Sequence, residues 1–369
     1  AGLITSSPAL VREMPWAKKF DRAEASLLAA AAEEPEAART SRPVTPPALV
    51  GAIEGRLGKG QSLQLLEPLD TWVPEARGSS ARVYLGKFPV QKGRANYAAI
   101  KLMRTQYADY ALPLFHEEAL ILTRMAGVPG VTPLVECGFI KFDKGAALPS
   151  DREHTSAETM TGAIMRLGSD EVESFLGLLE AKTAGGWVPY LAIEKQDQAN
   201  SLLHFCDAGA TRGRFWPLTN LLRMSVQICD IIEAAHERSI VYRDHKILHY
   251  YWLEDRNGVY MIDWNVARLH PNGLQDIEKQ MDLTQLGARA LHHILTGRTA
   301  PGALPMGPTR PEEIEAAATT YHTQWTYDDR RLPQSLKDVI ERVLAGSYHT
   351  AAALREDLKR CYLELPNGN

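Results

Sequence analysis

The chain has little cysteine, no strong excess of either charge and no long apolar run. Its four cysteines among 369 residues lack the spacing of a metal site or disulfide framework, so we expect buried free thiols and a reducing, cytoplasmic location. The formal net charge of −4 argues against nucleic acid as the main partner. No run approaches the roughly 20 apolar residues of a membrane span, and the first residues lack the pattern of a signal peptide. A globular protein of about two domains or lobes remains.

The first 62 residues differ in composition from the rest of the chain. Residues 23–34 are rich in Ala and Glu and predict a helix, because these residues favour the helical backbone. Residues 42–47 contain three prolines, which exclude further helix. We therefore interpret residues 1–62 as an N-terminal extension and linker.

Two kinds of pattern follow. Strand patterns dominate residues 63–196, with a helix at 112–125 and a polar insertion at 141–186 that carries its own helix at 170–181. The predicted strands of this part are 63–69, 82–88, 97–103, 131–140 and 188–194. Residues 197–369 are mostly helical, with predicted helices at 218–238, 282–296, 312–319, 333–345 and 350–363, and short strands at 240–242, 250–253 and 259–262. Strands followed by helices predict an α+β fold.

A group of polar residues in the second part has the kinds of side chain that phosphoryl transfer uses. Asp244 and Lys246 lie in the loop Tyr-Arg-Asp-His-Lys, and Asp263 follows the next strand pair. A carboxylate at Asp244 can accept a hydroxyl proton, Lys246 can reach a transferring phosphate, and Asp263 can hold a magnesium ion. His249 stands where the motif Arg-Asp-x-Lys-x-x-Asn has its asparagine.

Further motifs precede this loop in a fixed order. A turn containing Gly78 leads to Val83, and an apolar strand holds Ala99 and ends at Lys101. Glu118 lies on the next predicted helix, and a later strand ends at Glu194. With this order, residues 63–363 resemble the eukaryotic-type protein kinase superfamily, and Lys246 makes the loop similar to that of Ser/Thr kinases.

The resemblance implies a bilobal fold, with a β-rich N-lobe containing one main helix and a mostly helical C-lobe. It implies that Asp244 and Lys246 are catalytic and that ATP is the cofactor, bound with Mg²⁺ or Mn²⁺. The implied metal ligands are Asp263 and, at a degenerate position, His249. The implied nucleotide-binding residues are Gly78, Val83, Ala99, Lys101, Glu118 and Glu194, with Glu118 paired to Lys101.

Several departures bear on function. Imidazole is a poor ligand for magnesium, so His249 weakens the expected metal site. Only residues 268–281 separate the Asp263 region from Asp282, without the Ala-Pro-Glu motif or room for a peptide-docking segment. Ile262-Asp263-Trp264 and this short connection are also similar to aminoglycoside and choline kinases.

Three functions remain open on the sequence. The first is a pseudokinase or strongly impaired kinase that acts as a regulatory or binding module. The second is an active, atypical Ser/Thr protein kinase, and the third is a small-molecule kinase. For the first we expect a protein partner, bound through the insertion 141–186 or the N-terminal extension, with no nucleic acid and no membrane span.

Overall fold

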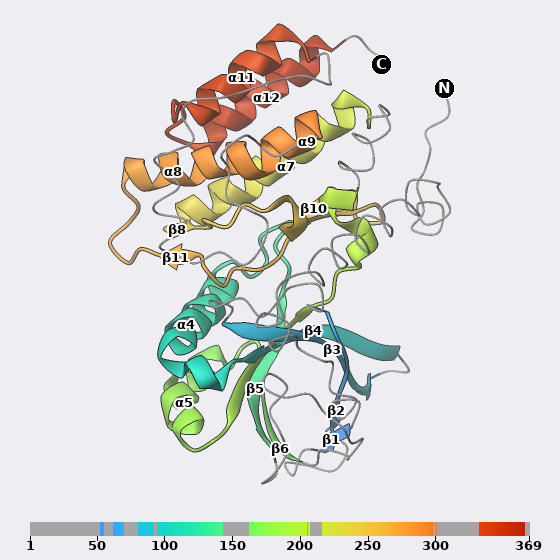
Figure 1. The fold of residues 1–369 in the computed structure, drawn as a ribbon, viewed down its shortest axis with the longest axis vertical. Helices are drawn as coiled ribbons and strands as arrows, with labels where there is room; N and C mark the ends of the chain where they lie inside the picture. The colour runs from blue at the N-terminus through green and yellow to red at the C-terminus, as the bar shows by residue number, and fades with distance from the viewer. Residues whose placement is uncertain are drawn as a thin grey trace, which may run out of the picture. The chain divides into compact units, whose positions relative to one another are not determined.

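The structure, a computed structural model, describes residues 52–54, 62–69, 80–91, 94–142, 162–204, 206, 216–297, 300 and 332–365. It has an α+β fold and divides into two compact units (Figure 1). The sheet unit comprises the described residues of Leu28–Ala126 and Thr132–Gln196, and the helical unit those of Gly127–Val131 and Asp197–Asn369. The helices predicted at 23–34 and 312–319 lie outside the described residues, as does Gly78.

One antiparallel sheet of seven strands, in the order β1-β2-β3-β4-β7-β5-β6, forms the sheet unit. The strands are β1 (Ala52–Glu54), β2 (Ser62–Pro68), β3 (Ala81–Gln91), β4 (Arg94–Met103), β5 (Leu134–Phe142), β6 (Gly162–Gly168) and β7 (Val188–Glu194). The edge strand β1 also contacts the opposite edge strand β6, so the sheet curls toward closure (Figure 1). The interpretation of 1–62 as extension and linker was therefore wrong at its end, because β1 and the first residue of β2 belong to the sheet.

Alternation along the strands separates the two faces of this sheet. Tyr84, Ile100 and Tyr190 belong to one buried apolar cluster, and since successive side chains point to opposite faces, Val83 and Lys101 lie on the other face. That second face is covered by α4 (Ala108–Arg124) and α5 (Val172–Ala184), which also contact each other (Figure 1).

The segment 141–186 is not a separate insertion in its described part. Residues 162–168 form β6, which pairs with β5 along its whole length, and α5 follows directly. Phe175 of α5 is fully buried and its ring centroid lies 5.0 Å from that of Phe139 on β5. The sheet unit therefore has two main helices, not the single one expected, and both strand and helix contribute to its core.

The helical unit is built around α7 (Leu218–Glu237), which contacts α12 (Ala351–Glu364) and α9 (His292–Thr296). Ile228, Ile232 and Ala235 recur at helical spacing on α7 and are fully buried. One helical stretch runs through α8 (Asp276–Leu286), the π-helical segment η5 (Gly287–Leu291) and α9. A further helix, α11 (Gln334–Leu344), contacts α12, α8 and η5.

The long helix begins six residues before the predicted start at Asp282. Gln275 and Glu278 form a capping box at its first turn, which satisfies otherwise unpaired backbone N–H groups. This signal lies in a polar stretch, so apolar periodicity missed it. No helix within the described ranges is long and apolar enough to cross a membrane.

Short strands and one turn position the loop residues of the helical unit. They are β8 (Ile240–Val241), the 3₁₀ turn η4 (Ile247–His249), β9 (Tyr250–Leu253), β10 (Gly258–Met261) and β11 (Arg268–Leu269). β9 pairs with β10, and β8 with β11. The carbonyl of Gly130 accepts a hydrogen bond from the Met261 amide at 2.7 Å. Gly130 has φ +83°, and a Cβ there would lie 2.7 Å from the Val259 carbonyl oxygen, so only glycine fits.

Candidate active site

Asp282 lies on the long helix and holds the backbone of the loop that follows β8. Its carboxylate accepts hydrogen bonds from the backbone amides of Tyr242 at 3.1 Å and Arg243 at 2.7 Å. It also pairs with His236 at 2.8 Å and His245 at 2.9 Å. Burial alone would raise the pKa of Asp282, but the two histidines lower it well below its ordinary value. The loop is therefore fixed to the helix by a buried carboxylate.

Asp244 is buried between two cationic side chains. Lys246 Nζ lies 2.7 Å from its Oδ2, and Arg289 Nη1 donates to its Oδ1 at 2.9 Å. Asp244 and Arg289 are 2% and 1% exposed, so water does not screen this ion pair. Burial opposes ionisation of Asp244, but Lys246, His249 and Arg289 together lower the pKa of its carboxyl. Asp244 is thus an ionised carboxylate with a cation at each oxygen.

His249, at the end of η4, is fixed through one ring nitrogen. Its Nδ1 lies 3.0 Å from the backbone oxygen of Asp244 and 2.9 Å from the hydroxyl of Tyr242. That hydroxyl donates its own proton to the carbonyl of Ile262 at 2.7 Å. Burial lowers the pKa of His249 to about 4, although Asp244 and Asp263 act in the opposite direction.

Asp263 completes the cluster from the segment after β10. Its Oδ2 lies 3.4 Å from His249 Nε2, and its side chain is 27% exposed. Asp263 has a positive φ of 62°, as does Arg243 at 71°. Non-glycine residues in this backbone region cost of order 1 kcal/mol or more and often occur at functional sites. The backbone bond from Ile262 N to His249 O at 3.0 Å keeps this segment beside η4.

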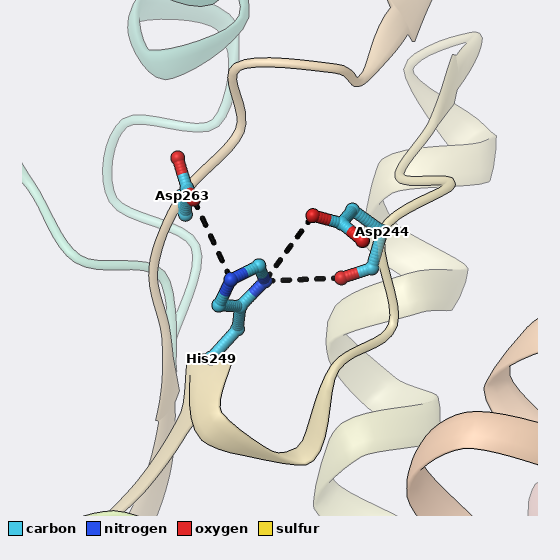
Figure 2. A group of neighbouring side chains, drawn as sticks. All are labelled: Asp244, His249 and Asp263. Carbon is cyan, nitrogen blue, oxygen red and sulfur yellow. Dashed lines mark hydrogen bonds and ion pairs between the residues drawn. The ribbon is translucent and has the colours of Figure 1, made fainter. Parts of the chain in front are cut away.

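Figure 2 shows the three side chains converging, with His249 between the two carboxylates. Asp244, His249 and Asp263 each offer one potential ligand atom, and these three atoms lie within 4.8 Å of one another. The structure therefore brings together the two residues expected to bind metal and one expected to be catalytic. Nitrogen and carboxylate oxygen donors of this kind suit a divalent metal ion.

In the sheet unit, Lys101 and Glu118 form the expected ion pair. Lys101 Nζ lies 2.5 Å from Glu118 Oε1, and both residues are buried, at 5% and 1% exposure. The lysine comes from β4 and the glutamate from α4, so the pair links the sheet to the helix that covers it. A buried ion pair needs such close geometry to offset the desolvation of both charges.

The other predicted nucleotide-binding residues of the sheet unit fall into two groups. Val83 pairs with Lys101 across β3 and β4, and Ala99 lies two residues before Lys101 on the same face. Glu194 pairs with Ala98 on the neighbouring strand, which places its side chain on the opposite face from Lys101. Of the residues of this set that the structure describes on the strands, Val83 and Ala99 therefore share a face with Lys101.

Sequence reasoning missed four contributors to the helical-unit site. Arg289 was not singled out, although a lone arginine among Leu286, Ala288, Ala290 and Leu291 is the kind of signal that marks a buried cation. The role of Tyr242, whose hydroxyl joins His249 to the Ile262 carbonyl, was not predicted either. The roles of His236 and His245 carried no local signal, because their partner Asp282 is distant in the chain.

Comparison with known proteins adds no family to this description. No protein-family model matches the chain, and no curated protein matches it.

Proposed function

We propose that the protein is a kinase-like, nucleotide-binding regulatory module whose phosphotransfer is strongly impaired. The observation that carries the proposal is the pairing of Asp244 with Lys246 on one oxygen and Arg289 on the other. A catalytic base must accept a hydrogen bond from the hydroxyl that it deprotonates. Here the acceptor hydroxyl would compete with a buried guanidinium for Oδ1.

The lowered pKa of Asp244 adds to this argument. A general base works best when its pKa lies near the working pH, because it must then hold the proton that it takes. Lys246, His249 and Arg289 move the pKa of Asp244 in the other direction. The position of His249, where the kinase motif has an asparagine oxygen, also weakens the expected binding of Mg²⁺.

Nucleotide binding is supported by the Lys101–Glu118 ion pair. The resemblance assigns Lys101 to the α/β-phosphates, and the contact with Glu118 at 2.5 Å holds this ammonium group in place. The residues that the resemblance assigns to nucleotide contact on the same face, Val83 and Ala99, flank it in the sheet. Binding of ATP without efficient transfer is thus the function that these contacts favour, with a protein partner as the recipient of the signal.

The same ion pair favours a second candidate, an active atypical Ser/Thr kinase. The resemblance to kinases requires Lys101, Asp244, Lys246 and Asp263, and all four are present. The short connection between β11 and α8, residues 270–275, would suit a small acceptor better than a docked peptide, which favours a third candidate, a small-molecule kinase. Transfer of the ATP γ-phosphate to an acceptor would distinguish these candidates from an impaired kinase.

The test is transfer of the ATP γ-phosphate, to the protein itself and to generic protein and small-molecule acceptors, with Mg²⁺ or Mn²⁺. We expect little transfer by the wild type and more Mg²⁺-dependent transfer by His249→Asn, which restores an oxygen ligand. Asp244→Asn should remove whatever activity remains. Robust wild-type transfer that Asp244→Asn abolishes would reject the impaired module in favour of the active kinase.

A further inference from the structure

We propose that His249 and Asp263 form a binding site for a divalent transition-metal ion of the Mn²⁺ type, with Asp244 as a third donor within reach. The site differs from a magnesium site in having an imidazole ligand in place of an amide oxygen. Figure 2 shows the imidazole ring placed between the two carboxylates. The metal site itself does not depend on the proposed function. Only the role of this metal in holding the phosphates of a bound nucleotide rests on that function.

The first step concerns the proton on His249. Its Nδ1 faces two oxygens, the Asp244 carbonyl at 3.0 Å and the Tyr242 hydroxyl at 2.9 Å. A carbonyl can only accept, and the single Tyr242 proton is given to Ile262 O at 2.7 Å. Nδ1 therefore carries the proton, and the neutral ring presents the lone pair of Nε2. Histidines that bind metals characteristically donate their other N–H to a backbone carbonyl in this way.

The second step concerns the direction and spacing of the Nε2 lone pair. Nε2 lies 3.4 Å from Oδ2 of Asp263, and both atoms are electron-rich when the ring is neutral. Two neighbouring ligands of an octahedral ion such as Mn²⁺, each at about 2.2 Å from the metal, lie about 3.1 Å apart. A cation that bridges the two atoms therefore needs little movement of either side chain.

The third step concerns the choice of metal. Mg²⁺ prefers oxygen ligands in near-ideal octahedral geometry, whereas imidazole suits the later divalent metals. The affinity of a mixed nitrogen and oxygen site rises from Mn²⁺ through Co²⁺ in the general order of these ions. The carboxylates of Asp263 and Asp244 keep the site hard enough for Mn²⁺, and His249 gives it a preference over Mg²⁺.

The experiment adds MnCl₂ to the full chain without nucleotide and measures electron paramagnetic resonance, with pulsed detection of ¹⁴N coupling. We expect bound Mn²⁺ with a coupling from one imidazole nitrogen, and retention of Mn²⁺ in about a hundredfold excess of Mg²⁺. His249→Asn should remove the nitrogen coupling and weaken Mn²⁺ binding at least about tenfold. His270→Asn, which makes the same change outside the cluster, should leave both unchanged.

Tyr242→Phe provides a test that keeps the ligand itself. It removes one acceptor of the Nδ1 proton, so Mn²⁺ affinity should fall about tenfold while the nitrogen coupling persists. Absence of bound Mn²⁺, or bound Mn²⁺ without nitrogen coupling in the wild type, would overturn the inference. Mn²⁺ binding with this coupling in a protein that binds no ATP would sustain the metal site and reject the proposed nucleotide function.

Discussion

Arg289 donates a hydrogen bond to Asp244 over 2.9 Å, and both side chains are almost completely buried. Arg289 lies in η5, where the helix takes on π-helical hydrogen bonding between α8 and α9. Such segments are rare and recur at functional sites. The loop that contains Asp244 is thus fixed to this helix by the charged side chain of Arg289, a contact that the sequence of the loop does not predict.

Substitution of this arginine should destabilise the protein strongly. Arg289→Met leaves the buried Asp244 carboxylate with Lys246 as its cationic partner, and loss of one member of a buried pair costs about 3–5 kcal/mol. Urea-induced unfolding measures the change in free energy of unfolding. Arg360→Met removes an exposed partner of Asp357 and should cost less than about 1 kcal/mol. Equal losses for the two variants would contradict the assignment.

Asp282 should be as important to stability as Arg289. Asp282→Asn keeps the shape of the side chain but removes its negative charge. This charge pairs with His236 and His245, and the carboxylate accepts hydrogen bonds from two backbone N–H groups. We expect a loss of about 3 kcal/mol or more in the free energy of unfolding. The matched variant Asp276→Asn, at an exposed first-turn position of α8, should lose under about 1 kcal/mol. A mild effect at Asp282 would show that the loop is held by other contacts.

His249 should make the protein less stable as the pH falls. Its pKa is about 4 in the folded chain and 6.5 when unperturbed, so the unfolded chain binds more protons between these values. The free energy of unfolding should therefore decrease as pH falls from about 6.5 to about 4, by on the order of 3 kcal/mol.

Chelator-treated wild type and His249→Asn would be compared by urea unfolding between pH 4.5 and 7. The variant should lose this part of the slope. The lowered pKa values of Asp244 and Asp282 act mainly below this range, because their stabilisation is lost only as pH falls below the ordinary pKa of a carboxyl. The same slope in both proteins would be inconsistent with a neutral, buried His249.

Lys101 can be tested for binding and stability separately. Lys101→Met should weaken binding of a fluorescent ATP analogue and also destabilise the sheet unit, since Glu118 is left buried without its lysine. The double variant with Glu118→Met should recover most of the stability but not the nucleotide binding. Lys182→Met on α5, as a control, should change neither. Full analogue binding by the double variant would remove Lys101 from the nucleotide site.

Local pattern predicted the bounds of some elements of this fold closely. The bounds of β7 and β9 match the prediction, and α7 differs by one residue at its end, because their apolar residues repeat regularly. β6 was missed because it lies between glycines in a polar segment, and β1 and β11 are only three and two residues long. Short strands depend on their partners in the sheet, which local sequence does not encode.

For the candidate site, sequence order placed most residues but not their partners. The motif spacing indicated Asp244, His249 and Asp263, and the structure brings them together. The pairing of Asp244 with Arg289 joins residues 45 positions apart and depends on how the helix packs behind the loop. The position of the proton on His249 depends on the contacts of Tyr242 with His249 and Ile262, which the sequence does not predict.

The most direct test of the proposed function is the thermal unfolding midpoint with ATP, Mg²⁺ and Mn²⁺, each alone and in combination. A ligand that binds the native state at about 100 times its Kd adds about 2.7 kcal/mol to stability, which raises the midpoint by several degrees. We predict a rise with ATP that depends on metal and is larger with Mn²⁺ than with Mg²⁺. No rise with ATP under any metal condition would contradict a nucleotide-binding, kinase-like module.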